Sequence, residues 1–483
     1  MNLCAVSRGG GPLSVQKMTK VYIGSGLDNE QFLIASNFIQ LDAGKGVCEL
    51  YTDQKLEPWF RDKLCQRLGI SIIEFNYPIF NSVWSGCVSI LFVPLVLILL
   101  SRPRNLLLFH PWPWINIALH SIYDTAYRYS PTSNIRPTIW QLSLATIRCG
   151  IAIARASFLL KKGFKYFVSG HNVYQFKIFN YVLSRHAHVY IQGRNNLRRI
   201  DRNNLFDTPL SLPSGFDIES IEASDELVTA FWESRRQGGT KNQEFLLANS
   251  GKTINPSRPI NIVFCHVFHD SPFFLYPGRR LFVDFIDWIG YTLKICASSN
   301  EEWIFRLHPS AASWGENSRT LMEKLIDKHA PGAKNIKIIE NEYSVESLIK
   351  ASKRIVTYSG TIQIEAVIMG KRPVIVGGGL VEQYAKDCAY TPSTLAEYVE
   401  FLKGDRNYRL LSNSRINLLR LMYGSETCRT YEVLLGLSKK VGGRIGPAEI
   451  DRLFSIMDKN SEILVENSKR LFNKGYLWFV EKI

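Results

Sequence analysis

The sequence predicts an α/β protein that contains two doubly wound domains in tandem, followed by a helical tail. Short apolar segments alternate with amphipathic segments of helical period in two separate series, a pattern typical of βαβ units and a mainly parallel sheet. A polar stretch rich in Gly, Asn and Ser, at residues 238–259, separates the two series. The chain has 483 residues and 46% of them are hydrophobic, which is enough for two large cores.

The domain boundaries follow from this alternation. Residues 1–16 are Gly/Ser-rich and are expected to be flexible. We place the first domain at residues 17–245, the second at 258–425 and the helical, basic tail at 426–483.

The first series begins with the segment Lys-Val-Tyr-Ile-Gly, which is expected to form a strand. A long amphipathic helix at 139–161 precedes its fourth strand. The expected strands are 20–24, 70–75, 105–110, 165–169 and 188–192, and the expected helices are 29–40, 115–123, 139–161, 171–184 and 225–236.

The second series has clearer periodicity. Apolar residues at 281, 282, 285, 286 and 289 recur at helical spacing, and Ser344 is a suitable helix N-cap. The expected strands are 260–265, 302–307, 335–339, 354–358 and 373–376, and the expected helices are 281–298, 318–329, 344–351, 361–369 and 395–402.

Charge and cysteine content narrow the possible partners. The net charge of +15 favours an anionic partner, such as acidic lipid, a phosphorylated substrate or an acidic polymer. Nucleic acid is not expected as a partner, because the sequence has no zinc knuckle and no RNA-binding aromatic signature. Nine cysteines without a Cys-x-x-Cys pair, and no secretory signal, indicate a reducing, cytoplasmic setting.

One segment, 87–100, is nearly all apolar and is followed by Arg102 and Arg104. It is shorter than the roughly 20 residues needed to span a bilayer, and Pro94 interrupts it. Two interpretations remain open. The segment is either a buried core element of the first domain, or an apolar patch that lies on a membrane with its arginines at lipid headgroups.

His308-Pro309-Ser310 follows the expected strand 302–307. Proline fixes φ and lacks an N–H donor, so the strand ends there and delivers His308 to the carboxyl edge of the sheet. A histidine held in this way can donate a hydrogen bond to a phosphate or to a nucleotide sugar. Arg306 is a countercharge if its side chain points the same way, which strand alternation leaves open.

Ser359-Gly360-Thr361 follows the expected strand 354–358 and opens a helix. Hydroxyls and N–H groups at a helix N-terminus can bind one phosphate, and Gly360 lets the backbone approach it closely. Glu365 lies one helical turn later and is a candidate for holding a sugar or ribose hydroxyl. A simple helix cap is the alternative interpretation of this motif.

A third group follows the first strand of the second domain. His266, His269 and Asp270 are suited to phosphate contact or to proton transfer. We expect no metal site, because a convincing third and fourth ligand are missing.

The first domain offers weaker candidates for the general base. His171 follows the expected strand 165–169, and His110 occupies a similar position before Pro111. Asp28 and Glu30 are carboxylate alternatives after the first strand.

Together these motifs resemble the bacterial capsule and surface polysaccharide biosynthesis proteins, which include capsular Kdo transferases. The His-Pro and Ser/Thr pair also resembles the motifs of bacterial sialyl- and polysialyltransferases. The resemblance covers about 260–380 and, more loosely, 165–192. It rests on the segments HVFHDSP, LFVDFIDWIGYTLK, WIFRLHPS and YSGTIQIEAVIMGKRPVIVGGG.

The resemblance implies a GT-B fold, in which two Rossmann-like domains face a cleft and no metal is obligatory. It assigns nucleotide binding to His308 and Pro309 and to Ser359 with Thr361, with a CMP-sugar among the candidate donors. The chain lacks the acidic pair followed by glycine that is the base motif of the sialyltransferases, and Gly360 separates its two hydroxyl residues. The resemblance therefore assigns no base.

The predicted function is a metal-independent glycosyltransferase without a resident cofactor. It would transfer a sugar from a nucleotide-activated donor to a lipid-linked or polysaccharide acceptor of capsule, O-antigen or lipopolysaccharide type. We expect it at the inner face of the plasma membrane as a peripheral protein, with His171 or Asp270 as the base. Two alternatives remain open: a glycerol- or ribitol-phosphate polymer transferase with a CDP-alditol donor, and a non-catalytic GT-B-like scaffold of an assembly complex.

Overall fold

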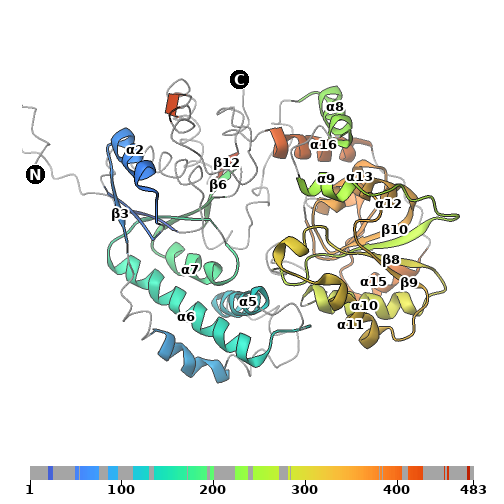
Figure 1. Ribbon diagram of the computed structural model, residues 1–483, viewed down its shortest axis with the longest axis horizontal. Helices are drawn as coiled ribbons and strands as arrows, with labels where there is room; N and C mark the ends of the chain where they lie inside the picture. The colour runs from blue at the N-terminus through green and yellow to red at the C-terminus, as the bar shows by residue number, and fades with distance from the viewer. Residues whose placement is uncertain are drawn as a thin grey trace, which may run out of the picture.

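The structure is a computed structural model, shown in Figure 1. It describes residues 20–24, 49–53, 55–75, 85–95, 113–129, 135–170, 172–192, 196–200, 223–237, 243–270, 281–282, 284–379, 381–382, 385–404, 412–427, 451, 454–455 and 476–478. The expected helix at 29–40 and the expected strand at 105–110 lie outside these residues.

The first unit is built on a seven-stranded sheet with the order β12-β6-β5-β4-β1-β2-β3. Strands β1 to β5 run parallel, and β6 is antiparallel to both of its neighbours. The strands are β1 Lys20–Ile23, β2 Glu49–Thr52, β3 Ser71–Glu74, β4 Tyr166–Ser169, β5 His188–Gln192, β6 Asn196–Ile200 and β12 Tyr476–Trp478.

Helices α6 and α7 lie along one side of this sheet, and α5 packs against both of them (Figure 1). Helix α6 begins where the sequence predicts, because Thr138 and Gln141 form a capping box. The helices of this unit are α2 Pro58–Leu68, an unlabelled helix Ser85–Leu95, α5 Pro113–Arg128, α6 Ile139–Lys161 and α7 Gln175–Ser184.

The second unit is built on a five-stranded parallel sheet with the order β11-β10-β7-β8-β9. Its strands are β7 Ile260–Phe264, β8 Trp303–Arg306, β9 Ile336–Ile339, β10 Ser352–Thr357 and β11 Val374–Ile375. Its helices are α10 Phe285–Ala297, η2 Ala312–Trp314, α11 Ser318–His329, α12 Val345–Ala351, α13 Ile362–Ile368, η3 Lys386–Cys388, α15 Leu395–Lys403 and α16 Ser412–Thr427.

Helices cover both faces of the second sheet, because alternate strand residues point in opposite directions. In β7, Val263 packs in one cluster with residues of α10, α11 and α15. Ile262 and Phe264 pack in another cluster with residues of α12 and with Ala366 of α13. The predicted class, α/β with two Rossmann-like units, is confirmed.

Helix α8 (Asp225–Arg236) is attached to the second unit, although the sequence prediction placed it in the first domain. Val228 and Trp232 are buried in a cluster with residues of α13 and α16. Asp225 also pairs with Arg420 at 2.6 Å. Helix α9 (Gln243–Asn249) contacts α12 in the same unit. The boundary at residue 245 is therefore wrong for α8, whose apolar face is covered by α16.

The predicted helical tail at 426–483 needs a second correction. Residues 476–478 form β12, which pairs antiparallel with β6 at the edge of the first sheet. The chain thus returns from the second unit to the first, as the adjacent labels β6 and β12 show in Figure 1. Residues 476–478 form a strand because their backbone pairs with β6, which is distant in sequence.

Each sheet has one topological switch point. In the first sheet the chain builds β1, β2 and β3 outward, then returns to add β4 on the other side of β1. In the second sheet the same reversal occurs between β7 and β10. Ligands in open α/β sheets bind in the crevice outside the carboxyl ends of the strands at such points. The topology therefore points to two candidate crevices.

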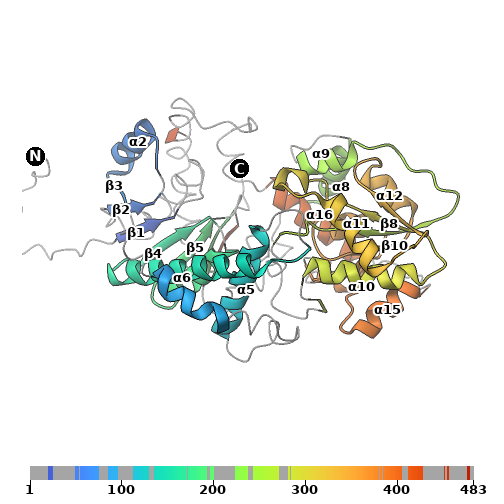
Figure 2. The same cartoon turned by 60° about the horizontal axis from the view of Figure 1, so that its bottom comes forward.

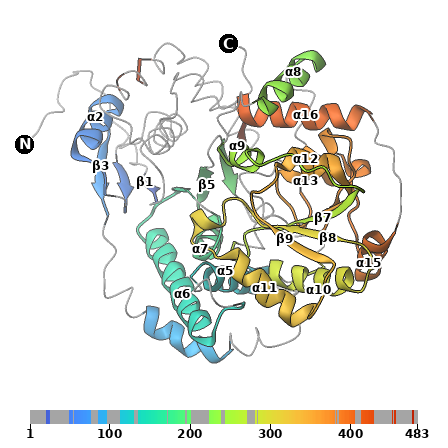
Figure 3. The same cartoon turned by 45° about the vertical axis from the view of Figure 1, so that its right-hand side comes forward.

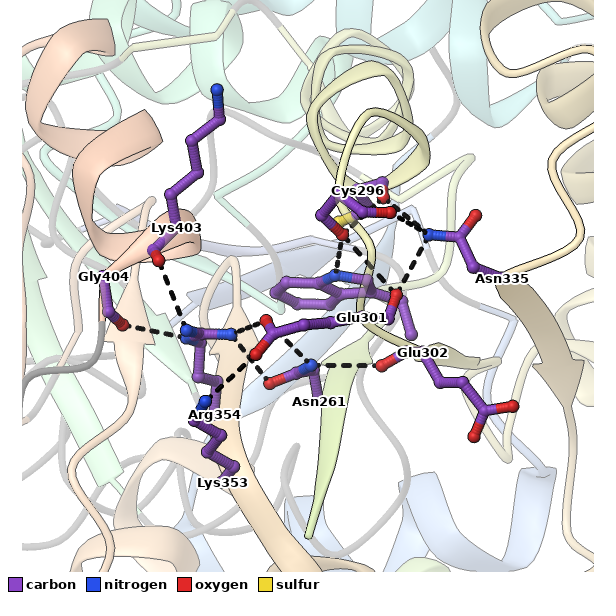
Figure 4. A network of polar contacts seen from close by, with 11 residues as sticks. Asn261, Cys296, Glu301, Glu302, Asn335, Lys353, Arg354, Lys403 and Gly404 are labelled. Carbon is purple, nitrogen blue, oxygen red and sulfur yellow. Dashed lines mark hydrogen bonds and ion pairs between the residues drawn. The ribbon is translucent and has the colours of Figure 1, made fainter. Parts of the chain in front are cut away.

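A polar network closes the opposite, amino edge of the second sheet (Figure 4). Arg354 donates to Asn261 Oδ1 at 3.1 Å and to Gly404 O at 3.0 Å, and it pairs with Glu301. Asn335 Nδ2 donates to three carbonyl oxygens at 2.9–3.0 Å. These side chains hold the starts of β7, β8 and β10 together, so this edge is structural.

Helix α5 joins the two units and lies between them in all three views (Figures 1, 2 and 3). Tyr123 and Tyr127 of α5 both donate to Asp284 Oδ2, at 2.7 and 2.9 Å. Asp284 is also the N-cap of α10 and accepts from Asp287 N at 2.6 Å. Tyr127 belongs to the core cluster of the second unit. The contact is therefore partly apolar and partly a buried hydrogen-bond cluster.

Candidate functional site

Three predicted residues reach the carboxyl edge of the second sheet at the same level. Phe264 is in register with Arg306 of β8 and with Thr357 of β10. Counting two residues onward in each chain aligns His266, His308 and Ser359. This places the backbones of the three residues at one level beyond the strand ends, next to the switch point, and the rings of His266 and His308 lie together there, with 5.7 Å between their centroids.

His308 presents a neutral ring to this crevice. Its Nδ1 accepts a hydrogen bond from Ser310 N at 3.2 Å, so the proton of the neutral ring is on Nε2. Burial, with His266 and Arg306 nearby, lowers the pKa of His308 to about 3. The ring is therefore a hydrogen-bond donor without a positive charge. Strand β8 ends at Arg306, shortly before Pro309, and Ser310 supplies the backbone N–H that orients the ring.

His266 lies in the middle of the group. Its ring centroid is 5.7 Å from that of His308. It stacks on Phe285 of α10, with 4.3 Å between ring centroids and 9° between planes. The stacking fixes the plane of the imidazole, which leaves its edge for polar contacts.

Ser359 contributes a hydroxyl that no described residue pairs with. The residue is 3% exposed, and its Oγ has no hydrogen-bond partner in the part of the chain that the structure describes. Its carbonyl oxygen accepts from Thr357 Oγ1 at 3.0 Å, which holds the turn. A buried hydroxyl without a partner is costly, and a ligand oxygen can supply what is missing.

Gly360 and Thr361 complete the turn into α13. Gly360 has φ of +100°, which side-chain-bearing residues rarely adopt. Thr361 is the exposed N-cap residue, and its side chain makes no capping bond to the backbone. Helix α13 has only seven residues, fewer than the sequence predicts, so the contribution of its dipole is small.

Glu365 and Arg306 are buried and interact with the protein. Glu365 is 6% exposed and hydrogen-bonds Thr361, and burial raises its pKa despite the nearby charges of Arg235 and Arg306. Arg306 donates to Ala248 O at 3.2 Å and to Asn341 Oδ1 at 3.3 Å. Its guanidinium is therefore held by the loop after β9 and by α9. Direct contact of Glu365 with a sugar hydroxyl stays a prediction.

The other residues of the third motif are divided between two roles. His269 pairs with buried Glu316, with Nδ1 3.0 Å from Oε2, and its N–H donates to the same oxygen. This pair fixes the loop after β7. Asp270 instead faces the first unit and accepts from Tyr174 Oη at 3.2 Å.

Tyr174 is a functional candidate that the sequence prediction missed. It is the one non-glycine residue with positive φ (56°) in the described part of the chain. Strained backbone of this kind persists where the surroundings hold it and is frequent at functional sites. Here it places a hydroxyl of the first unit against Asp270 of the second. Nothing in the sequence signals this conformation.

Four candidate bases cannot be placed. His171, His110, Asp28 and Glu30 lie outside the described residues. Of the two bases predicted, only Asp270 therefore has a defined environment. Within the described ranges no three His, Cys, Asp or Glu side chains gather as metal ligands would.

The switch point of the first sheet opens into a cavity of about 300 Å³. Its lining includes Gly24 after β1, Asp53 after β2 and Ser169 at the end of β4. Helix α6 contributes Arg148 and Arg155. The sequence prediction missed these two arginines. Their spacing of seven residues within a helix that was predicted correctly was the available signal.

Comparisons with known proteins give fold-level likenesses only. The chain matches no protein-family model and no curated protein. It is similar to a glycosyltransferase from Rickettsia africae ESF-5, with a TM-score of 0.23 and 12% identity over 93% of this chain and 98% of that one. Anabaena Alr3699/HepE in complex with UDP gives a TM-score of 0.24 and 11% identity over 93% and 100% of the two chains.

UDP-GlcNAc 2-epimerase from Neisseria meningitidis, bound to UDP-GlcNAc, gives a TM-score of 0.27 and 12% identity over 85% of this chain and 99% of that one. Similarity at this level does not bear on the activity of the present chain.

Proposed function

We propose that the chain is a GT-B glycosyltransferase that binds a nucleotide-activated sugar at the carboxyl edge of the second sheet. The observation that carries the proposal is the alignment of His266, His308 and Ser359 at the switch point, with Ser359 Oγ buried and unpartnered. The acceptor, a surface glycan of capsule, O-antigen or lipopolysaccharide type, is held by the first unit. The protein works at the cytoplasmic face of the membrane.

The spacing of the donors favours a nucleoside diphosphate. Strand β7 separates β8 from β10, so the Cα atoms of His308 and Ser359 lie about 9.6 Å apart at the usual strand spacing. A ligand that contacts both must extend across the end of β7. A diphosphate spans this distance more readily than a single phosphate, which makes UDP-, CDP-, GDP- and dTDP-sugars better candidates than a CMP-sugar.

The chemistry follows from these positions. The acceptor hydroxyl oxygen attacks the anomeric carbon, and the bond between that carbon and the donor phosphate oxygen breaks. Negative charge grows on the leaving phosphate, and hydrogen bonds from His308 Nε2–H and Ser359 Oγ–H strengthen as it does. Asp270 takes the proton of the acceptor hydroxyl, and Tyr174 holds the carboxylate toward the first unit.

The test is calorimetric titration of the full chain with CMP, CDP, UDP, GDP and dTDP. We expect at least one to bind, and His308→Ala and Ser359→Ala each to weaken it about 10- to 100-fold, the value of a hydrogen bond to a charged group. Ser359→Ala should leave the free energy of unfolding unchanged or raise it, because it removes an unpartnered buried hydroxyl.

Exposed His186 provides the matched control, since His186→Ala removes an imidazole far from the crevice in sequence and fold. Failure of all five nucleotides to bind, or equal weakening by His186→Ala and His308→Ala, contradicts the proposal.

A further inference from the structure

The cavity of the first unit has the features of an anion site. Arg148 and Arg155 line it from α6, about 10 Å apart along the helix axis. The guanidinium of Arg148 lies over the ring of Tyr129, with Cζ 3.6 Å from the ring centroid, which is a cation–π contact. Two guanidinium groups on one wall favour a phosphate or a carboxylate.

The N-terminus of α7 meets the same cavity. Gln175 and Phe176, its first two residues, are part of the lining, and the side chain of its N-cap residue, Tyr174, makes no capping bond. Gln175 Oε1 is buried and has no hydrogen-bond partner among the described residues. Helix α7 has ten residues, so its terminal N–H groups and dipole add to the attraction for an anion. The helix terminus and the arginines are independent observations that favour the same kind of ligand.

A carboxylate in the lining favours a ligand that also carries hydroxyl groups. Asp53 follows β2 and lines the cavity. Close approach of a ligand to the backbone is possible at Gly24, whose N–H donates to Val168 O at 2.8 Å. Arginines from α6 and a carboxylate from the end of β2 fit a sugar phosphate, whose phosphate accepts from the arginines and whose hydroxyl donates to the carboxylate.

An apolar surface adjoins this cavity. The helix Ser85–Leu95 lies against α6 on the side away from the sheet, as Figures 1 and 3 show. The two helices approach closely: a Cβ on Gly150 would overlap the Ser89 side chain, and one on Gly86 would contact Ile147 and Ile151. Ile151 also lines the cavity. The interface of the two helices therefore borders the anion site.

The outer face of this helix pair is exposed and hydrophobic. Leu91 is 77% exposed and Trp140 of α6 is 70% exposed. Smaller exposed fractions, all above one third, occur at Ile90, Phe92, Leu95 and Leu144. Helix α6 is long and apolar enough to cross a bilayer, but 33% of its most apolar window is buried and it packs on α5 and α7. An apolar face beside cationic side chains on a chain of net charge +15 fits an anionic membrane surface.

We propose that this cavity binds the glycosyl phosphate end of a lipid-borne acceptor. The phosphate lies between Arg148, Arg155 and the N-terminus of α7, a sugar hydroxyl reaches Asp53, and the lipid enters the bilayer beside helix 85–95. The identification of this ligand as the acceptor rests on the proposed function, whereas the binding of its phosphate group does not.

The experiment uses the full chain and three probes. Glucose 1-phosphate, titrated calorimetrically, tests the cavity with a soluble ligand. Flotation with phosphatidylcholine vesicles, with and without polyprenyl phosphate, tests the lipid-borne form. UDP, or whichever nucleotide binds best, reports on the second crevice independently.

Four variants separate the contributions. Arg148→Gln/Arg155→Gln should weaken glucose 1-phosphate at least about tenfold and abolish the extra recruitment by polyprenyl phosphate, while nucleotide affinity is unchanged. Lys161→Gln, an exposed position on α6 outside the cavity lining, is the charge control and should bind both probes normally. Leu91→Ser/Phe92→Ser should reduce flotation with the vesicles and leave the affinity for glucose 1-phosphate unchanged. Leu227→Ser, on α8, should leave flotation unchanged.

Three outcomes overturn the proposal or part of it. If the double arginine variant retains its affinity for glucose 1-phosphate, or if Lys161→Gln loses as much affinity as that variant does, the cavity is not the binding site. If glucose 1-phosphate binds in an arginine-dependent way but polyprenyl phosphate recruits no additional protein to the vesicles, the ligand is not lipid-borne. If no nucleotide binds but the arginine dependence is found, the proposed function fails and the phosphate site stands.

Discussion

His308 occupies a position where burial and a neighbouring imidazole both oppose protonation. A cationic histidine would bind phosphate by charge, but this one is neutral and acts through its Nε2–H. Ser359 acts in the same way through a hydroxyl. At the proposed donor site, His308 and Ser359 therefore offer hydrogen bonds without charge, whereas the cavity of the first unit presents two guanidinium groups.

Acidification should reveal the environment of His308. Its pKa is lowered from 6.5 to about 3 in the folded chain, so below pH 6.5 the unfolded chain binds a proton that the folded chain does not. The free energy of unfolding therefore falls as pH decreases through this window, by about 2 kcal/mol over about 1.5 pH units, and is independent of this group at higher pH.

His308→Gln should lose less stability than the wild type between about pH 6.5 and pH 5, measured by urea unfolding. Exposed His186→Gln is the control and should follow the wild type. The same acid dependence in His308→Gln and in the wild type would show that the imidazole is solvated.

The His-Pro position could be predicted at this scale because Pro309 ends a strand by a local steric rule. The unpartnered state of Ser359 Oγ could not, because it depends on which side chains from other strands reach the turn. Arg148 and Arg155 were overlooked for a similar reason. Their helix was predicted, but the cavity that they line also includes Asp53, which follows β2, a four-residue strand that the sequence did not reveal.

At the scale of elements, the turn between β10 and α13 positions the donor site. Gly360 has φ of +100°, and a Cβ added there would meet no atom within 4 Å. Gly332, after α11, is also in the left-handed region, with φ of +74° and the same open surroundings. Both glycines therefore have positive φ and open surroundings, and Gly360 alone of the two lies at the proposed site.

Alanine at either glycine should cost about 1–2 kcal/mol of unfolding free energy from backbone strain alone. Gly360→Ala should in addition weaken nucleotide binding, because the turn that carries Ser359 and Thr361 must shift. Gly332→Ala should leave the nucleotide affinity unchanged. If titration gives equal nucleotide affinities for the two variants, the turn at Gly360 takes no part in ligand binding.

Elements with a local signal were predicted best. The bounds of α6 and α11 match the prediction because polar N-caps precede apolar residues at helical spacing. Strands β2, β6 and β12 escaped detection, since each is short and is decided by its pairing partner. Helix α13 is shorter than predicted, which moves the binding argument from the helix dipole to the hydroxyls of the turn.

At the scale of the whole molecule, one buried carboxylate takes part in the contact between the two units. Asp284 is 1% exposed and accepts from two tyrosines of α5 that precede it by 161 and 157 residues. Burial, with the charge of Asp284, raises the pKa of both tyrosines well above the ordinary value, so both remain protonated donors. No pattern in the sequence pairs residues so far apart.

Removal of both hydroxyls should loosen the junction without disturbing either sheet. Tyr123→Phe/Tyr127→Phe keeps the rings but leaves Asp284 with the Asp287 N–H as its remaining donor among those described. We expect a loss of about 2–4 kcal/mol of unfolding free energy, because hydrogen bonds to a charged group are removed. Small-angle scattering should show a larger radius of gyration with unchanged circular dichroism. Tyr181→Phe, within the first unit, should change neither quantity. An unaltered radius in the double variant would mean that apolar packing around Tyr127, and not the carboxylate, holds the two units together.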